Sequence, residues 1–223
     1  MTEPLQRPRR KDPLKKTRVP LLPQGVRSRT ALGLTAAAAE GRFQLQVCSE
    51  CGTVVYPPRD ACPRCLSARL LATIERHNAF PDDPSQYRGG WAMDIAELYA
   101  MAGVGAGDVD LVQTYDDYPV ICMMQMEDLG FCRKGEGPYF VRSHTLTNDG
   151  SFPHNVSGGQ LSVGQAGAAG GFLGLVEAVR QVTGSANGTQ VPDAKVGLVS
   201  GFGMINYDRG LASGAAVLAG AGV

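Results

Sequence analysis

Four cysteines in two closely spaced pairs are the clearest chemical signal in the sequence. Cys48 and Cys51 are separated by two residues, as are Cys62 and Cys65, and ten residues lie between the pairs. A tetrahedral zinc ion takes four thiolates at about 2.3 Å, and each Cys-x-x-Cys turn can supply two of them. Two separate redox motifs would be the alternative, but no thioredoxin-like strand–helix–strand pattern surrounds either pair. The spacing therefore predicts one structural zinc site with all four positions filled by cysteine.

A glycine-rich turn further along the chain could stabilise negative charge. Asn155 comes shortly before Gly158 and Gly159, and Gly164 with Gln165 is expected to open a helix. Main-chain N–H groups at the start of a helix, together with a side-chain donor, favour a developing anion. The alternative is that the glycines only let the helix pack closely against its neighbours. We expect Asn155, Gly158, Gly159 and Gly164 to bind substrate.

Two tyrosines flank two carboxylates in the sequence Tyr115-Asp116-Asp117-Tyr118. A tyrosine can act as a general acid or base when its pKa is lowered. The alternative is an ordinary turn at the end of a strand, with solvated acidic side chains. The pattern makes Tyr115, Asp116 and Tyr118 candidate catalytic residues.

The chain has 223 residues, a mass of 23.5 kDa and 43% hydrophobic residues, enough for a packed core. Lys+Arg and Asp+Glu both number 21, so the overall charge indicates no polyanionic partner. No apolar run approaches the roughly 20 residues of a membrane helix, and no apolar segment of a secretory signal follows the first charges. We therefore expect a cytoplasmic protein without a membrane partner.

Residues 1–29 contain five prolines and nine basic residues, against two acidic ones. Such a segment buries too little apolar surface to fold by itself. It could be a nucleic-acid-binding arm, but a solvated tail is the simpler interpretation, so a nucleic-acid partner is not expected. The first region, residues 1–39, is therefore predicted to be a disordered tail with one short helix at residues 35–41.

The remaining pattern predicts alternating strands and helices, and hence an α/β layer with a central sheet. Strands are expected at residues 43–47, 109–114, 139–143, 195–200 and 214–218. Helices are expected at residues 92–102, 119–130 and 164–183.

Residues 40–69 resemble a known zinc-binding module. The segment RFQLQVCSECGTVVYPPRDACPRC is similar to the rubredoxin-like zinc ribbon of the acyl-CoA-associated ribbon/OB-fold proteins. An OB-fold follows the ribbon in that family, whereas here an α/β pattern begins directly after Arg69. The resemblance implies a structural zinc ion.

Residues 70–223 resemble the C-terminal half of the thiolase superfamily. Four segments carry the resemblance in the family's order: AGVGAGDVDLVQTYDDYP, EDLGFCRKGEG, NVSGGQLSVGQAGAAGG and LVSGFGMINYDRGLASGAAVL. It implies a mixed sheet with helices on both faces, and a coenzyme A thioester as substrate that reacts through an enolate. Tyr115 falls where the family has an asparagine, Gln165 falls where it has a histidine, and Tyr207 lies in a loop that borders the family's site.

The resemblance also implies what is missing. The acylated cysteine of thiolases belongs to an N-terminal half that has no counterpart in this sequence, and Cys122 and Cys132 lie in no nucleophile motif. Thiolase-like aldolases that partner ribbon/OB proteins resemble the chain in this respect and rely on tyrosines. We therefore expect acyltransfer or retro-aldol chemistry on an acyl-CoA, with a homo-oligomer or a thiolase-like partner subunit completing the site. A non-catalytic acyl-CoA or subunit-binding module, and a nucleic-acid-binding ribbon, are the alternatives.

Overall fold

The computed structural model describes residues 36–42, 45–48, 51–56, 62, 68–83, 87–164, 170–206, 209–220 and 223. The predicted disordered tail, residues 1–29, lies outside these described residues. Within them, no helix is both long enough and apolar enough to cross a lipid bilayer.

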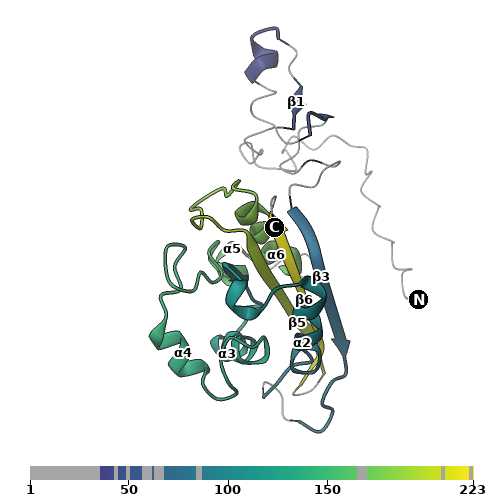
Figure 1. Ribbon diagram of the computed structural model, residues 1–223, viewed down its shortest axis with the longest axis vertical. Helices are drawn as coiled ribbons and strands as arrows, with labels where there is room; N and C mark the ends of the chain where they lie inside the picture. The colour runs from purple at the N-terminus through teal and green to yellow at the C-terminus, as the bar shows by residue number, and fades with distance from the viewer. Residues whose placement is uncertain are drawn as a thin grey trace, which may run out of the picture.

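Within the described part of the chain, four strands form a mixed sheet with the order β3-β6-β5-β4 (Figure 1). The strands are β3 (Ala68–His77), β4 (Leu111–Gln113), β5 (Val196–Asn206) and β6 (Arg209–Gly220). β6 pairs antiparallel with both β3 and β5, whereas β4 runs parallel to β5. A short parallel strand beside two long antiparallel ones places the carboxyl end of β4 next to the middle of β5.

Helices cover both faces of this sheet. One face carries α2 (Trp91–Ala102) and α3 (Pro119–Asp128), and the other carries α6 (Gly171–Val182). Two neighbouring residues of β5 show the division, because successive side chains of a strand point to opposite faces. Leu198 belongs to the core with α2 and α3, and Val199 to the core with α6. The predicted mixed sheet with helices on both faces is confirmed.

Trp91 fixes the start of α2 on the sheet. Its ring is fully buried, and its indole N–H donates to the carbonyl of Gly214 at 2.8 Å. The main-chain N–H of Gly90 donates to the hydroxyl of Ser213 at 2.9 Å. A Cβ atom at Gly90 would lie 2.6 Å from the Cβ atom of Arg76, so this close approach requires glycine.

Most of the predicted elements are present, and the differences have local causes. The expected helices at 92–102 and 119–130 are α2 and α3, and the two closing strands are β5 and β6. The expected strand at 139–143 is wrong, because these residues lie in the helix α4 (Gly137–Ser143). Pro138 in the first turn favours a helix start, and Phe140 packs edge-on against Phe152 at 4.8 Å between ring centres. The strand β3 was not expected from the sequence.

The predicted helix at 164–183 begins later than expected. Gly164 ends the short helix α5 (Gly159–Val163) with φ +105°, a backbone conformation that favours glycine. Residues 165–169 lie outside the described residues, and α6 begins at Gly171. Gly164 is therefore a helix end, and the expectation that it opens a helix is wrong.

The ribbon region contains a small hairpin. β1 (Gln46–Val47) and β2 (Val54–Val55) pair antiparallel, and residues 36–39 are helical, within the short helix expected at 35–41. A 3-10 turn, η1 (Ala106–Asp108), precedes β4 in the α/β part. The division of the chain at 39/40 and 69/70 stays a prediction.

Candidate functional site

Tyr115 follows the carboxyl end of β4, and its main-chain N–H and carbonyl are both hydrogen-bonded to one side chain. Its N–H donates to Oε1 of Gln125 at 3.2 Å, and its carbonyl accepts from Nε2 of Gln125 at 2.7 Å. Its ring packs against Phe202 of β5, with 6.4 Å between the ring centres. The side chain is half-buried, so a predicted catalytic residue is both partly accessible and firmly positioned.

Gln125 is the residue that fixes Tyr115, and the sequence analysis did not single it out. The side chain is fully buried on α3 and also accepts a hydrogen bond from the Ser200 hydroxyl at 2.7 Å. Its amide therefore joins α3, β5 and Tyr115, the second residue after β4. A polar residue within the otherwise apolar helix segment Val120–Met126 was the available signal.

Replacing Gln125 with alanine should lower the free energy of unfolding by about 2–4 kcal/mol, because the main-chain groups of Tyr115 and the Ser200 hydroxyl lose buried partners. Val120→Ala, at an exposed position of the same helix, should change it by less than about 0.5 kcal/mol. Denaturant unfolding of both variants is the measurement. A Gln125→Ala variant as stable as Val120→Ala would contradict this role.

Asp116 is bound to main-chain N–H groups, whereas a catalytic proton donor would face the substrate. Its carboxylate accepts the main-chain N–H of Gln160 at 2.8 Å and that of Leu161 at 3.5 Å. It thus caps the first turn of α5, and a Cβ atom at Gly159 would collide with it. Asp116 therefore occupies two N–H groups at the start of this helix.

The turn that contains Asn155 is tied to the same strand end. Asn155 accepts the N–H of Thr114 through Oδ1 at 2.8 Å and donates through Nδ2 to the carbonyl of Thr114 at 3.2 Å. Asn155, Gly158 and Gly159 all have positive φ, at +46°, +92° and +67°. The structure therefore brings together Tyr115, Asp116 and the expected substrate-binding residues of this turn, while Gly164 lies at the far end of α5.

His154 joins this cluster, and the sequence analysis did not single it out. Its Nε2 lies 2.7 Å from the hydroxyl of Thr114. Burial lowers the pKa of His154 to about 4, so the ring is neutral at pH 7. A neutral imidazole beside Thr114 stiffens the strand end without adding charge.

The other predicted site residues are placed differently. Tyr118 is exposed and immediately precedes α3. Gln165, Tyr207 and Cys65 lie outside the described residues.

Two buried glutamines line a small pocket between β4, α5 and the start of α6. Gln113 is 1% exposed and Gln160 is 6% exposed. The pocket is lined by Gln113, Thr114, Asn155, Ser157, Gly159, Gln160, Gly171, Leu173, Gly174, Val199 and Ser200. Gln113 is the polar last residue of an otherwise apolar strand, and this was the signal in the sequence that could have identified it as a site residue.

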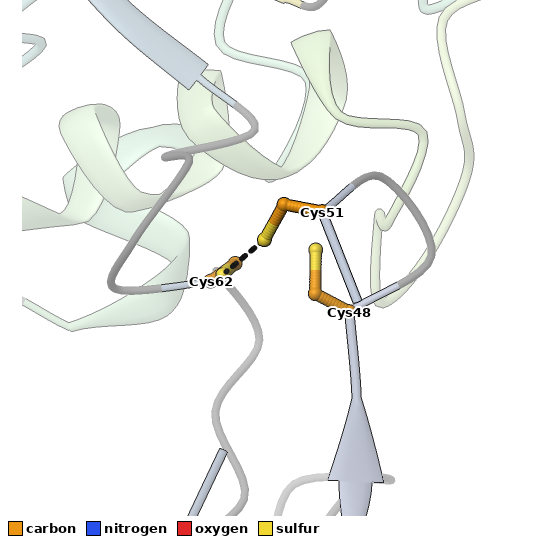
Figure 2. Close-up of side chains that lie close together, drawn as sticks. All are labelled: Cys48, Cys51 and Cys62. Carbon is orange, nitrogen blue, oxygen red and sulfur yellow. Dashed lines mark hydrogen bonds between the residues drawn. The ribbon is translucent and has the colours of Figure 1, made fainter. Parts of the chain in front are cut away.

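Three of the four predicted metal ligands lie together. Figure 2 shows the side chains of Cys48, Cys51 and Cys62 converging on one point. Their sulfur atoms all lie within 4.8 Å of one another, and Sγ of Cys51 is 3.6 Å from Sγ of Cys62. Sulfur atoms on a tetrahedral zinc ion, at about 2.3 Å from the metal, are roughly 3.8 Å apart. A zinc ion therefore fits at the centre of the three sulfur atoms.

The two remaining cysteines, Cys122 and Cys132, are both partly buried. Burial raises the pKa of the Cys122 thiol, and burial together with Glu127 and Glu136 raises the pKa of Cys132 to about 11. A reactive cysteine needs its thiolate form near neutral pH. Neither residue therefore resembles an activated nucleophile.

Comparison with known proteins identifies similar sequences for both regions. Residues 76–212 match the family described as thiolase C-terminal domain-like, and residues 35–70 match the ChsH2, rubredoxin-like zinc ribbon domain. An acetyl-CoA acetyltransferase of Methanothermobacter thermautotrophicus is 35% identical over 105 residues, which are 47% of this chain and 27% of the relative. A steroid side-chain-cleaving aldolase of Thermomonospora curvata is 38% identical over 89 residues, 40% of this chain and 22% of the relative.

A solved structure shares the fold. The Ltp2-ChsH2(DUF35) aldolase matches with a TM-score of 0.55 and 24% identity, over 76% of this chain and 41% of that one. The chain thus spans about a quarter of the length of the two curated relatives. Since the first family match covers more than half of the sequence, the chain belongs to the thiolase C-terminal domain-like family.

Proposed function

We propose that this chain takes part in breaking or forming a carbon–carbon bond next to a coenzyme A thioester, by a retro-aldol type of reaction. The observation that carries the proposal is the joint position of Tyr115, Asp116 and the Asn155–Gly159 turn at the carboxyl end of β4. Hydrogen bonds from the N–H of Thr114 to Asn155 and from the N–H of Gln160 to Asp116 hold these segments together. Thiolase-like and aldolase relatives support this class of chemistry.

Tyr115 is our candidate for the proton transfer. In the cleavage direction, a tyrosinate takes the proton of a hydroxyl on carbon 3 of the acyl chain. The bond between carbons 2 and 3 then breaks, a ketone or aldehyde leaves, and the electron pair forms the thioester enolate. The tyrosine returns its proton to carbon 2, so the steps balance. Tyr118 and Tyr207 are second candidates for this role.

The enolate oxygen needs hydrogen-bond donors that are already in place. Asp116 occupies the N–H groups of Gln160 and Leu161, so we assign the donor role to Gly159 and to the side-chain amide of Gln165. Asp116 then orients the turn and has no part in proton transfer. This changes its role from the one expected from the sequence.

We propose that a zinc ion bound by Cys48, Cys51, Cys62 and Cys65 is structural. With four thiolates it has no open position for substrate. The carbon–carbon chemistry is thus assigned to the α/β part, and a second copy or a thiolase-like subunit is proposed to complete the site.

The test uses 3-hydroxy-3-methylbutanoyl-CoA, whose retro-aldol cleavage gives acetone and acetyl-CoA. We expect acetone release by the protein, with or without an added thiolase-like subunit, and at least a 100-fold decrease for Tyr115→Phe. Tyr139→Phe, at an exposed position of α4, is the matched control and should leave the rate unchanged.

Thiolysis of acetoacetyl-CoA should stay at background, because neither Cys122 nor Cys132 is activated to form a covalent acyl intermediate. Two results would contradict the proposal: acetone release that Tyr115→Phe leaves intact, or no release under either condition. Robust thiolysis, abolished by alkylation of Cys122 or Cys132, would instead identify a nucleophile and a thiolase-type reaction.

A further inference from the structure

Two buried glutamines in the pocket beside β4 have polar atoms without a hydrogen-bond partner among the described residues. These atoms are Nε2 of Gln113, a donor, and Oε1 of Gln160, an acceptor. Both side chains are more than nine-tenths buried, and both line the same pocket.

Two other buried glutamines show how unusual this is. Gln125 uses both ends of its amide on Tyr115, Ile121 and Ser200. Gln181 donates to Glu177 and to the carbonyl of Thr189, and it accepts from the N–H of Val191. Buried polar atoms are nearly always paired, because an unpaired one loses its hydrogen bonds to water without replacement. A donor and an acceptor left open in one pocket therefore indicate a ligand group that pairs with both.

The shape of the pocket limits what that group can be. The open space has room for about one water-sized group. Gly174 of α6 approaches so closely that a Cβ atom there would lie 3.2 Å from the Cβ atom of Gln113. A ligand hydroxyl, like a water molecule, has this size and can accept one hydrogen bond while it donates another.

The position of each glutamine is fixed relative to the candidate site. Gln113 lies two residues before Tyr115, at the end of β4. The main chain of Gln160 is bound by the carboxylate of Asp116 at 2.8 Å. Thr114 and Asn155, which hold the strand end, also line the pocket. A ligand group seated here lies beside Asn155 and Gly159 of the turn that is proposed to bind substrate.

We infer that Gln113 and Gln160 form a subsite for the hydroxyl on carbon 3 of the acyl chain and select 3-hydroxyacyl thioesters. This inference rests on the proposed function. Gln113 donates to the hydroxyl oxygen, and the hydroxyl donates to Gln160 until its proton is removed. A 3-oxo group accepts hydrogen bonds only and leaves Gln160 unpaired, and a 3-deoxy chain leaves both glutamines unpaired. Sites that bind a hydroxyl in this way reject analogues that lack it.

Calorimetric titration of the full chain with three thioesters tests the subsite. The probes are 3-hydroxy-3-methylbutanoyl-CoA, 3-methylbutanoyl-CoA and acetoacetyl-CoA. We expect the hydroxy compound to bind at least about tenfold more tightly than the other two. Gln113→Met and Gln160→Met should each reduce that preference to about twofold or less, whereas Gln46→Met, in the ribbon hairpin, should preserve it.

The outcomes separate the two proposals. Equal binding of all three thioesters by the unmodified protein would overturn the subsite while leaving the acyl-CoA function intact, and this comparison does not depend on how the variants fold. A preference that survives in folded Gln113→Met and Gln160→Met proteins would also overturn it. No binding of any thioester would overturn the proposed function and the subsite with it.

Discussion

The protein should bind one zinc ion per chain, and loss of the ion should unfold the ribbon while the α/β part stays folded. The reason is the small size of the ribbon hairpin, whose strands β1 and β2 contain two residues each. Zinc binding contributes about 10–16 kcal/mol in small zinc-dependent modules, more than such a hairpin can gain from burial. Metal analysis of the purified protein should give about one equivalent.

The test removes Cys62, one of the three cysteines in Figure 2, together with Cys65, the other cysteine of its predicted pair. Cys62→Ser combined with Cys65→Ser should abolish zinc binding, whereas Cys132→Ser, in the α/β part, should retain it. Trp91 is the single tryptophan and is buried under the sheet, so its fluorescence reports on the α/β core alone. It should not change when zinc is removed. Full zinc retention by the double variant, or much less than one equivalent in the unmodified protein, would contradict the prediction.

The elements that could be predicted from the sequence are those with a strong local pattern. The helix α2 has apolar residues at helical spacing and ends at Gly103, which has φ +70° as a helix-ending glycine should. The residues of α4 have the aromatic and β-branched composition of a strand, and only Pro138 and the packing of Phe140 decide for a helix. β3 was not predicted, because it is an edge strand that pairs only with β6 in the described sheet. Many of its residues are exposed, so its sequence lacks the apolar pattern of a buried strand.

The candidate site was predictable where residue type alone carries the chemistry. Tyr115, Asn155 and the metal-binding cysteines were found in this way, and the structure brings Cys48, Cys51 and Cys62 together. Gln125 and Gln160 were not found, because a glutamine has no fixed role until the groups around it are known. The same limit applies to Asp116, whose carboxylate binds α5 through contacts that are 44 and 45 residues away along the chain.

The outer surface of α5 and α6 should make the protein self-associate or capture a partner subunit. Leu161 and Val163 are 60% and 52% exposed, and Phe172 and Val176 are 64% and 44% exposed. The inner face of α6 meanwhile buries Glu177 and Gln181, which hydrogen-bond to each other. The same inner face packs Ala178 and Val182 against the sheet, so α6 is apolar on its outer face as well as on its inner one, which is the pattern of an interface.

Covering several hundred Å² of such surface contributes several kcal/mol at about 25 cal/mol per Å², enough for pairing at ordinary protein concentrations. Light scattering during size exclusion should therefore give a mass above 23.5 kDa for the protein alone. Phe172→Glu combined with Leu161→Glu should shift the mass toward the monomer, because a charge buried in an apolar contact is strongly unfavourable. Met101→Glu, at an exposed apolar position of α2, is the matched control and should leave the association unchanged.

The outcome decides more than the oligomeric state. If the unmodified chain is a monomer that binds no hydrophobic dye, the outer surface of α5 and α6 is not an interface. The proposed site at the carboxyl end of β4 would then have to work without residues from a second subunit. If Phe172→Glu with Leu161→Glu gives a folded monomer that still binds acyl-CoA but no longer cleaves it, binding belongs to this chain. Catalysis then depends on the partner that covers α6.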